Sequence, residues 1–573
     1  MKNTLLALFA SCLILVSCGD GSQTGSSSSN DGPREAKGDK VYGGILRVAE
    51  NEDIQSLYPH KILDAITWRL ATQIYEGLVK FKQSAPTEVM PACAESWDLD
   101  ESGTVYSFKL RKGVYFHDDP CFADGKGREV TANDFKYCFE LLCTQWPDNH
   151  AFGLTFKDRV KGANAYYAGE SEGGIEGIKV IDDHTLQITL ENPYSPFPYI
   201  LASPLTAVFP HEAYEKYKMD IKVGSGPFSH AGSVENQSTT LVRNPKYYGK
   251  DADGNQLPYL DSVEVKIIHI KSKELTEFKK GELDMIYGLP TESIIEVLEQ
   301  GTGVGTKYTV QRDPEMSIQY YEFLNQGSVF ESKKVRQAFS YAIDRTRIVE
   351  YILKGESEGP GIYGVTPPTF KGYDITQIEG YEIDLDKARQ LLADAGYPDG
   401  KGFPKVVLEY NRGSRNQKVA LEIQKQLQNN LNINLEISIV SLAQKIERSQ
   451  NGKLEFFRSG WIADFPSPEN FLMLLYGKNV PESLDEPSYP NTCRYVNPEF
   501  DALFEKALSA ATEEESNQFF MAAEKLAMAD APMIILWYEE SYRLLQPYVQ
   551  GAENNPMQYR DYSVTYFKKP AAN

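Results

Sequence analysis

Residues 454–471 read Leu454-Glu-Phe-Phe-Arg458-Ser-Gly460-Trp461-Ile-Ala-Asp464-Phe465-Pro-Ser-Pro-Glu-Asn-Phe471, a stretch that sets one cation and one anion among aromatic and apolar residues. Residues 454–461 have the content of a buried strand, and Pro466 and Pro468 prevent a helix from beginning directly after it. Asp464 is therefore predicted at the end of a strand. A carboxylate in apolar surroundings is costly to desolvate unless a cation or a hydrogen-bond donor meets it. That partner is either a lysine or arginine of this chain or the amine of a ligand, and the local sequence leaves both open.

On both sides of this stretch the sequence alternates between strand and helix patterns. Strand-like apolar runs and helical spacing of apolar residues predict an α/β lobe over residues 315–535. Its predicted strands lie at 406–410, 433–440 and 454–461, and its predicted helices lie at 335–349, 386–395, 417–429 and 442–449.

The part of the chain before residue 315 is richer in strands. Residues 106–110, 184–190 and 263–268 alternate between apolar and polar side chains and are separated by Gly, Pro and Asp turns. A folded body of about 530 residues exceeds what one hydrophobic core usually supports, so two or three domains are expected.

The N-terminus predicts export. Lys2 supplies a positive charge, residues 5–16 are apolar but too short to span a bilayer, and small residues precede Cys18. This resembles a bacterial lipoprotein signal, which implies removal of residues 1–17 and acylation of Cys18. A Gly/Ser-rich flexible tether is predicted at 18–40. The predicted location is the cell envelope, in the periplasm or on the extracytoplasmic face, with a lipid anchor in the membrane. The alternative is an ordinary secretory signal with an accidental cysteine, and it predicts export as well.

Composition excludes several classes of partner. The chain has 59 basic and 80 acidic residues, a formal charge of −21, and loss of Lys2 with the signal makes it −22. Such a balance argues against binding to nucleic acid. After removal of Cys12 and lipidation of Cys18, the cysteines left as core residues or possible disulfide partners are Cys93, Cys121, Cys138, Cys143 and Cys493. Their spacing does not resemble a zinc site, so no metal and no cofactor is predicted. No feature of the sequence indicates an oligomer, and a monomer is predicted.

The sequence does not predict an enzyme. Residues 301–307 faintly resemble a phosphate-binding loop, but Tyr308 stands where a serine or threonine should bind magnesium, and a surface turn is the preferred interpretation. No Gly-x-Ser-x-Gly elbow and no His-Glu-x-x-His zinc motif occurs.

Several further segments carry a family resemblance. In chain order they are Gly43-Gly-Ile-Leu-Arg-Val-Ala49, Tyr75-Glu76-Gly77-Leu78-Val79, Ser107-Phe-Lys-Leu-Arg-Lys-Gly-Val-Tyr-Phe-His117, Val130-Thr-Ala-Asn-Asp-Phe135, Gly224-Ser-Gly-Pro-Phe228, Arg243-Asn-Pro-Lys-Tyr-Tyr248 and Val335-Arg-Gln-Ala-Phe-Ser-Tyr-Ala-Ile-Asp344. As a set they resemble the large bacterial extracellular solute-binding proteins of family 5, which serve peptide and nickel ABC importers. The resemblance extends over nearly the whole mature chain.

The resemblance implies a two-lobed α/β fold of the periplasmic-binding-protein type, type II in the large cluster C form, with an extra subdomain inserted in lobe one. The implied boundaries are 41–87, 181–312 and 536–573 for lobe one, 88–180 for the inserted subdomain, and 313–535 for lobe two. The chain then crosses between the lobes near Asp313 and near Pro532, and the two crossings form a hinge that lets the lobes close over a solute. Closure excludes water and strengthens the charged contacts inside.

The nearest resemblance within the family is to its oligopeptide binders, and it implies the roles of several residues. The aspartate that binds the α-ammonium group of a peptide corresponds to Asp464, and an arginine for the terminal carboxylate corresponds to Arg458. Backbone partners for an extended peptide are implied at Glu76, at Tyr287 and along the strand that contains Trp461 and Ile462. Peptide side chains would occupy roomy, water-filled pockets with weak selectivity.

Each of these residues also has a purely structural interpretation. Arg458 and Asp464 could pair with the chain itself, Trp461 could be core, and Glu76 could receive a lysine. The residues at Met316 and Ile462, taken as a pair, and at Gly288 depart from the family pattern. They indicate that the ligand pocket differs from that of other family members.

The predicted function is that of an extracytoplasmic lipoprotein that captures peptides in an interlobe cleft and delivers them to an ABC transporter permease. The alternatives are the same fold with a nickel chelate, haem or an oligosaccharide as solute, and a signalling or adhesin lipoprotein.

Overall fold

The computed structural model describes residues 34–568 except 148, 172, 302–306, 371 and 511, and the side chains of residues 298–301 are likewise not described. The predicted signal peptide, Cys18 and the tether up to residue 33 lie outside the described residues, as does most of the loop at 301–307. None of the helices within the described ranges is long and apolar enough to cross a membrane.

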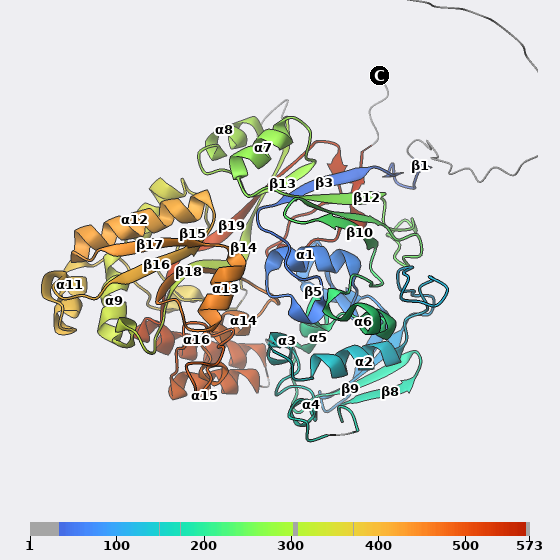
Figure 1. Ribbon diagram of the computed structural model, residues 1–573, viewed down its shortest axis with the longest axis horizontal. Helices are drawn as coiled ribbons and strands as arrows, with labels where there is room; N and C mark the ends of the chain where they lie inside the picture. Colours follow the sequence, from blue (N-terminus) through green and yellow to red (C-terminus); the bar gives the residue numbers. More distant parts are fainter. Residues whose placement is uncertain are drawn as a thin grey trace, which may run out of the picture.

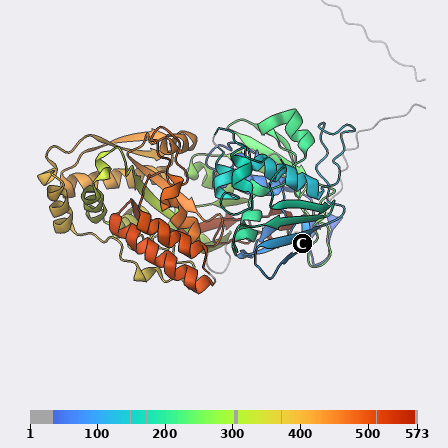
Figure 2. The ribbon, with the colours of Figure 1, turned by 90° about the horizontal axis from the view of Figure 1, so that it is seen from below.

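Two lobes are joined by two long antiparallel strands, β14 (Thr309–Phe323) and β19 (Met533–Leu545), which run from one lobe into the other (Figures 1 and 2). Residues 309–314 pair with 540–545, residues 318–322 pair with 533–538, and the register shifts between Pro314 and Ile318. The change of lobe therefore falls around Glu315 and Glu539. The first crossing lies close to the predicted one, but the second lies later than Pro532, because that proline only precedes the strand that makes the crossing.

Lobe two is built on the far half of this sheet, whose strand order is β13-β19-β14-β18-β16-β17, where β13 is Met285–Tyr287 of lobe one. Strands β16 (Val406–Asn411), β17 (Leu435–Val440) and β18 (Phe456–Ile462) confirm the strand predictions for this lobe. Strand β16 is parallel to both of its neighbours, as expected when helices connect successive strands.

The helices of lobe two lie around this sheet and are visible on the left of Figure 1. They are α9 (Lys333–Ala342), α10 (Arg345–Arg347), α11 (Leu385–Asp394), α12 (Ser414–Leu431), α13 (Leu442–Gln450), α14 (Glu469–Leu472), α15 (Pro498–Leu508) and α16 (Glu513–Asp530). The predicted helices at 386–395, 417–429 and 442–449 are confirmed, whereas the pattern at 335–349 is divided between α9 and α10. Asp344 ends the first and caps the second by accepting a hydrogen bond from the Arg347 backbone N–H.

Lobe one contains a four-stranded sheet of order β10-β11-β12-β3, made of Phe228–Val234, Ser238–Arg243, Ser262–Ile267 and Ile45–Glu50. Helix α1 (Ala65–Ile74) lies beside it (Figure 1). Strand β13 (Met285–Tyr287) and helices α7 (Lys271–Lys279) and α8 (Ile294–Gly301) cover the lobe-one end of β19.

A second four-stranded sheet, of order β6-β7-β9-β8, belongs to the inserted part of lobe one. Its strands are Ala94–Leu99, Val105–Leu110, Thr185–Thr189 and Ile178–Asp182, and it carries helices α2 (Ala132–Leu142), α3 (His150–Leu154) and α4 (Ala163–Tyr167). Short hairpin β4 (Val79–Lys82) and β5 (Ala85–Pro91) precedes it, and α5 (Phe197–Leu201) and α6 (His211–Tyr217) follow it. The predicted boundary at residue 180 divides β8 and leaves β9 outside, so the inserted unit extends beyond it.

The N-terminal edge of lobe one begins earlier than the sequence predicts. Strand β1 (Arg34–Glu35) pairs with β2 (Val41–Tyr42), and Lys40 forms ion pairs with Asp251 at 2.5 Å and Asp253 at 2.9 Å. Residues 34–40 therefore belong to the folded body, although the Gly/Ser content of the preceding residues predicts a tether up to residue 40.

The five cysteines of the folded body are free thiols. All are buried except Cys121, which is half-buried, and burial raises the pKa of its thiol to about 12. These cysteines act as apolar core residues.

Candidate functional site

A cavity of about 210 Å³ lies between the two lobes. From lobe one it is lined by residues 62–65, Trp68, Arg69, Leu154, Leu205, Met557 and Gln558, and from lobe two by Tyr320, Glu322, Leu442, Lys445, Ile446, Ser449, residues 460–464, Tyr489, Pro490 and Thr492. Two larger hollows, of about 620 and 870 Å³, are open depressions lined by lobe one and its inserted part. We focus on the smaller interlobe cavity because closure of the lobes would enclose a molecule bound there.

Asp464 lies in this cavity, two residues after the end of β18. Its backbone N–H donates to Asn470 Oδ1 at 3.0 Å, and the same oxygen accepts the indole N–H of Trp461 at 2.8 Å. Asn470, itself fully buried on α14, thus holds the segment between strand and helix in one conformation. The residues predicted for the site that line the cavity are therefore Asp464, Trp461 and Ile462.

No cation of the described chain neutralises Asp464. Burial raises the pKa of its carboxyl to about 7, and the only group that opposes this shift is the Asn470 amide. A carboxylate kept without a counter-charge in a partly closed cavity is typical of a binding group for a cation.

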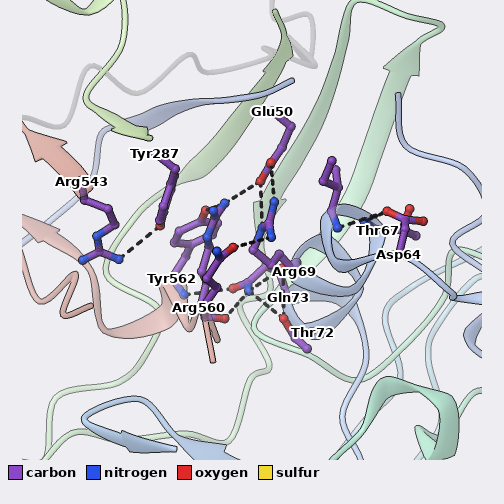
Figure 3. Close-up of polar contacts among 12 residues, drawn as sticks. Glu50, Asp64, Thr67, Arg69, Thr72, Gln73, Tyr287, Arg543, Arg560 and Tyr562 are labelled. Atoms are coloured by element: carbon purple, nitrogen blue, oxygen red, sulfur yellow. Dashed lines mark hydrogen bonds and ion pairs between the residues drawn. The ribbon is translucent and has the colours of Figure 1, made fainter. Parts of the chain in front are cut away.

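A second carboxylate, that of Asp64, lines the cavity from lobe one. Asp64 caps α1, since its Oδ1 accepts the backbone N–H groups of Ile66 at 3.1 Å and Thr67 at 2.8 Å (Figure 3). Tyr489 lies close to both carboxylates, and its pKa is raised first by burial and then by these two charges. Two carboxyl groups, one from each lobe, therefore lie near Tyr489 in the cavity.

Helix α13 presents one face to the cavity. Leu442, Lys445, Ile446 and Ser449 follow the spacing of neighbours on a helix surface, and all four line the cavity. Lys445 therefore places a cationic side chain in the lobe-two wall of the cavity, the same wall that contains Asp464.

Arg458 does not line the interlobe cavity. Its guanidinium donates to Asn411 Oδ1 at 2.9 Å and to the side-chain oxygen of Gln319. Asn411 in turn donates to Glu52 of lobe one at 3.2 Å, so Arg458 belongs to a contact between the lobes. Both terminal nitrogens of the guanidinium thus have partners, and its Nε, buried without a partner, does not line the cavity, so the carboxylate-binding role predicted for Arg458 is not supported by this position.

Tyr287 lies in a buried polar network beside the cavity (Figure 3). Its ring packs under the Arg560 guanidinium, 3.2 Å from ring centroid to guanidinium carbon, and its hydroxyl accepts from Arg543 at 3.3 Å. Its carbonyl accepts from Lys271 at 2.5 Å, so its main-chain acceptor already has a donor.

Glu50 is the centre of that network. Arg69 and Arg560 approach its two carboxylate oxygens to 2.6 and 2.5 Å, as Figure 3 shows. Burial alone would raise the pKa of Glu50, but the two guanidinium charges lower it to about 2. Because Arg69 also lines the cavity, this pair forms a charged but neutralised part of its wall.

Glu76 lies apart from the cavity. Its carboxylate accepts the hydroxyl of Tyr247 at 2.5 Å and that of Tyr248, and the Lys80 ammonium lies 3.6 Å away. The predicted role of Glu76 as a backbone partner for a peptide is not supported by this position, because Glu76 does not line the cavity and its backbone carbonyl already accepts the Val208 N–H at 3.0 Å.

The lobes touch around the cavity. Glu469 of α14 accepts from Arg159 at 3.0 Å and from the Tyr194 hydroxyl at 2.6 Å, and both partners belong to lobe one. At another point of the interface Lys418 and Glu292 form an exposed ion pair at 2.9 Å. The structure therefore shows the lobes in contact, which is the closed arrangement.

Sequence reasoning missed Lys445, Asp64, Arg69, Tyr489 and Gln558. Lys445 lies on a helix that was predicted correctly. The spacing of apolar residues in a helix does not show which of its polar residues face another lobe and which face solvent. Asp64 carried one usable signal, since it stands directly before an apolar-periodic helix as a capping residue does. The remaining positions depend on how distant segments pack.

Comparison with known proteins places these features in context. A family model described as bacterial extracellular solute-binding proteins, family 5 middle, matches residues 88–482. The periplasmic oligopeptide-binding protein OppA of Escherichia coli is 27% identical over 509 residues, which cover 87% of this chain and 88% of that protein. Heme-binding protein A of Haemophilus influenzae is 27% identical over 571 residues, which cover 98% of each chain.

A solved structure shares the fold over almost its full length. The periplasmic binding protein DppA of Helicobacter pylori, in complex with the peptide STSA, superposes with a TM-score of 0.81 at 26% identity. The superposition covers 93% of this chain and 99% of that one. The two-lobed α/β fold predicted from the sequence is confirmed.

Proposed function

Because the chain belongs to the bacterial extracellular solute-binding proteins of family 5, we propose that it captures peptides in its interlobe cavity and passes them to the membrane permease of an ABC transporter. The observation that carries this proposal is the Asp464 carboxylate, which faces a cavity between two lobes and has no cation of the described chain beside it. The α-ammonium group of a peptide supplies the missing charge.

The strand before Asp464 can also bind a peptide main chain. β18 pairs with β14 along residues 456–462 but with β16 only at Phe456 and Phe457. The other edge of residues 458–462 is therefore free of strand partners in the described chain. An extended peptide that lies along this edge would receive the main-chain hydrogen bonds that its own amides need once buried.

Closure completes the site. β14 and β19 change lobes at the register shift near Glu315, so a small rotation there opens the cavity or brings Arg159 onto Glu469. A bound peptide that touches both lobes stabilises the closed form, which the permease then recognises.

The relatives are binding proteins, and we extend that role to this chain without a catalytic step. Removal of residues 1–17 and acylation of Cys18 are further parts of the proposal, and the N-terminal sequence supports them. We also propose that the protein acts as a monomer.

Native mass spectrometry of protein purified without denaturation tests the function, because a closed binder retains its ligand through purification. We expect a heterogeneous set of bound masses that fragment as peptides. Release of haem, which the similarity to Heme-binding protein A makes the main competing ligand, or of any other single non-peptide compound would refute the peptide assignment while leaving the receptor role.

The affinity for free-amine peptides is expected to rise between pH 5 and 7. Burial raises the pKa of Asp464 to about 7, so below that pH the carboxyl is protonated and must lose its proton to bind an ammonium ion. The expected change approaches tenfold per pH unit, and it levels off above pH 7, where the carboxyl is ionised and the peptide amine, with a pKa of about 8, begins to lose its charge.

Titration calorimetry of wild type and Asp464→Asn across this range is the measurement. Asp64, Tyr489 and Lys445 are present in both proteins, so only the difference between the two profiles reports on Asp464. Parallel profiles would show that another group controls the pH dependence.

A further inference from the structure

We propose that Lys445 is the second anchor of the interlobe cavity and binds the terminal carboxylate of a short peptide whose ammonium group meets Asp464. The site then selects di- and tripeptides with two free ends over longer or C-terminally blocked peptides. This inference rests on the proposed function and assigns to Lys445 the role that the sequence suggested for Arg458.

The position of Lys445 on α13 is well determined. Ser441 Oγ accepts the backbone N–H of Gln444 at 3.2 Å, and Gln444 Oε1 accepts the backbone N–H of Ser441 at 3.0 Å. This capping box sets where α13 begins and therefore which face points into the cavity. That face contains Lys445 between the apolar side chains of Leu442 and Ile446.

The Lys445 ammonium has no hydrogen-bond or ion-pair partner within the described chain. Glu322 also lines the cavity and its charge acts on Lys445, but its carboxylate accepts the Thr492 hydroxyl at 2.5 Å and forms no ion pair with Lys445 among the described residues. Burial lowers the pKa of Lys445 to about 8, and Arg458 acts in the same direction, while Glu322 opposes them. The Lys445 Nζ also lies 5.7 Å from the centroid of the Phe457 ring, a weak contact that does not neutralise its charge. An arriving carboxylate would therefore stabilise the ammonium group.

Arg458 is less suited to this task. It is already held by Asn411 and Gln319, and it does not line the cavity. Arg69, the other cation in the wall, is neutralised by Glu50 at 2.6 Å. Of the cations that line the cavity, Lys445 is the one without such a partner among the described residues.

The size of the cavity favours a short ligand. Its volume of about 210 Å³ lies below the range of about 300–1,000 Å³ that holds drug-sized ligands. A peptide that meets both Asp464 and Lys445 within this partly closed cavity has only a few residues.

Titration calorimetry with dialanine, trialanine and pentaalanine tests the proposal, each as free acid, C-terminal amide and N-acetyl derivative. For wild type, we expect the two shorter free acids to bind tightest and amidation to weaken them by roughly 10- to 100-fold, the range of one hydrogen bond to a charged group. Lys445→Gln should weaken the free acids by a similar factor and leave the amides unchanged.

Two further variants complete the design. Lys445→Arg retains a cation and should keep the preference for free acids, which separates loss of charge from damage to α13. Lys425→Gln makes the same substitution at an exposed position of α12 in the same lobe and should behave as wild type.

The outcomes distinguish failure of the role of Lys445 from failure of the proposed peptide-binding function. Binding that depends on Asp464 but is indifferent to amidation, or equal losses for acids and amides in Lys445→Gln, overturns the role of Lys445 and leaves the peptide receptor intact. Tightest binding of pentaalanine overturns the selection for short peptides. Absence of binding for all nine compounds overturns the proposed function together with this inference.

Discussion

Asp464→Asn is expected to weaken the binding of peptides with a free N-terminus by roughly 30- to 1,000-fold, the range for truncating one partner of a buried charge pair. Burial of the Asp464 carboxyl group disfavours its charged form, and no cation of the described chain pairs with it. The ammonium group of a bound peptide therefore loses its counter-charge when the carboxylate becomes an amide. N-acetylated peptides carry no such charge, and we expect them to bind wild type and variant about equally. Titration calorimetry with matched free and acetylated peptides measures both.

A matched control removes a carboxylate from an exposed part of the same lobe. Asp386→Asn in α11 should bind every peptide as wild type does. Equal losses for free and acetylated peptides in Asp464→Asn would contradict the ammonium role and indicate a general disturbance of the cavity.

Thermal unfolding provides a second readout for Asp464→Asn. Folding raises the pKa of Asp464 from 3.8 to about 7, so the folded protein favours the protonated form and loses stability as pH rises through this interval. At pH 8 the empty variant should therefore melt at or above the temperature of the empty wild type. A clear decrease in melting temperature would show that the carboxylate has a structural partner.

Glu469→Gln is expected to weaken the binding of every peptide by roughly 30- to 150-fold, with no dependence on the peptide termini. Glu469 joins α14 to Arg159 and Tyr194 of lobe one only when the lobes are closed, and both ends of the ion pair are then largely buried. Without the carboxylate, closure buries the Arg159 charge with no counter-charge, at a cost of about 2–3 kcal/mol after allowing for the partial exposure of Arg159. In the open form water solvates both groups, so the penalty falls on closure alone.

Small-angle X-ray scattering with and without saturating peptide measures the closed fraction, and calorimetry measures affinity. The control is Glu292→Gln, which removes an interlobe ion pair with Lys418 that is about half exposed at both ends. Exposed pairs contribute little, so this variant should bind within a few-fold of wild type. If both variants lose the same affinity, the contact at Glu469 has no special part in closure.

The sequence was sufficient for most elements and for the place of Asp464. β18, α12 and α13 follow from the period of their apolar residues, and Pro466 and Pro468 separate the strand from α14. These patterns are local, because burial of one face of a strand or helix leaves its period in the residues themselves. The family motifs then supplied the two-lobed arrangement that periodicity alone does not contain.

The partners of the charged side chains needed the tertiary structure. Arg458 lies six residues before Asp464 in the same predicted stretch, yet it binds Asn411 and Gln319 instead of facing the cavity. Glu76 belongs to a family motif, but two tyrosines and Lys80 surround its carboxylate. Lys445 carries no motif and still reaches the cavity wall.

The reason is that an ion pair or hydrogen bond acts over a few ångströms in space and has no period along the chain. Arg159 and Glu469 are 310 positions apart, and Arg560 and Glu50 are 510 apart, so only the packing of the lobes brings them together. The chain's local patterns established which residues form strands and helices, whereas the folding of distant segments against one another decided which charges are neutralised and which remain open to a ligand.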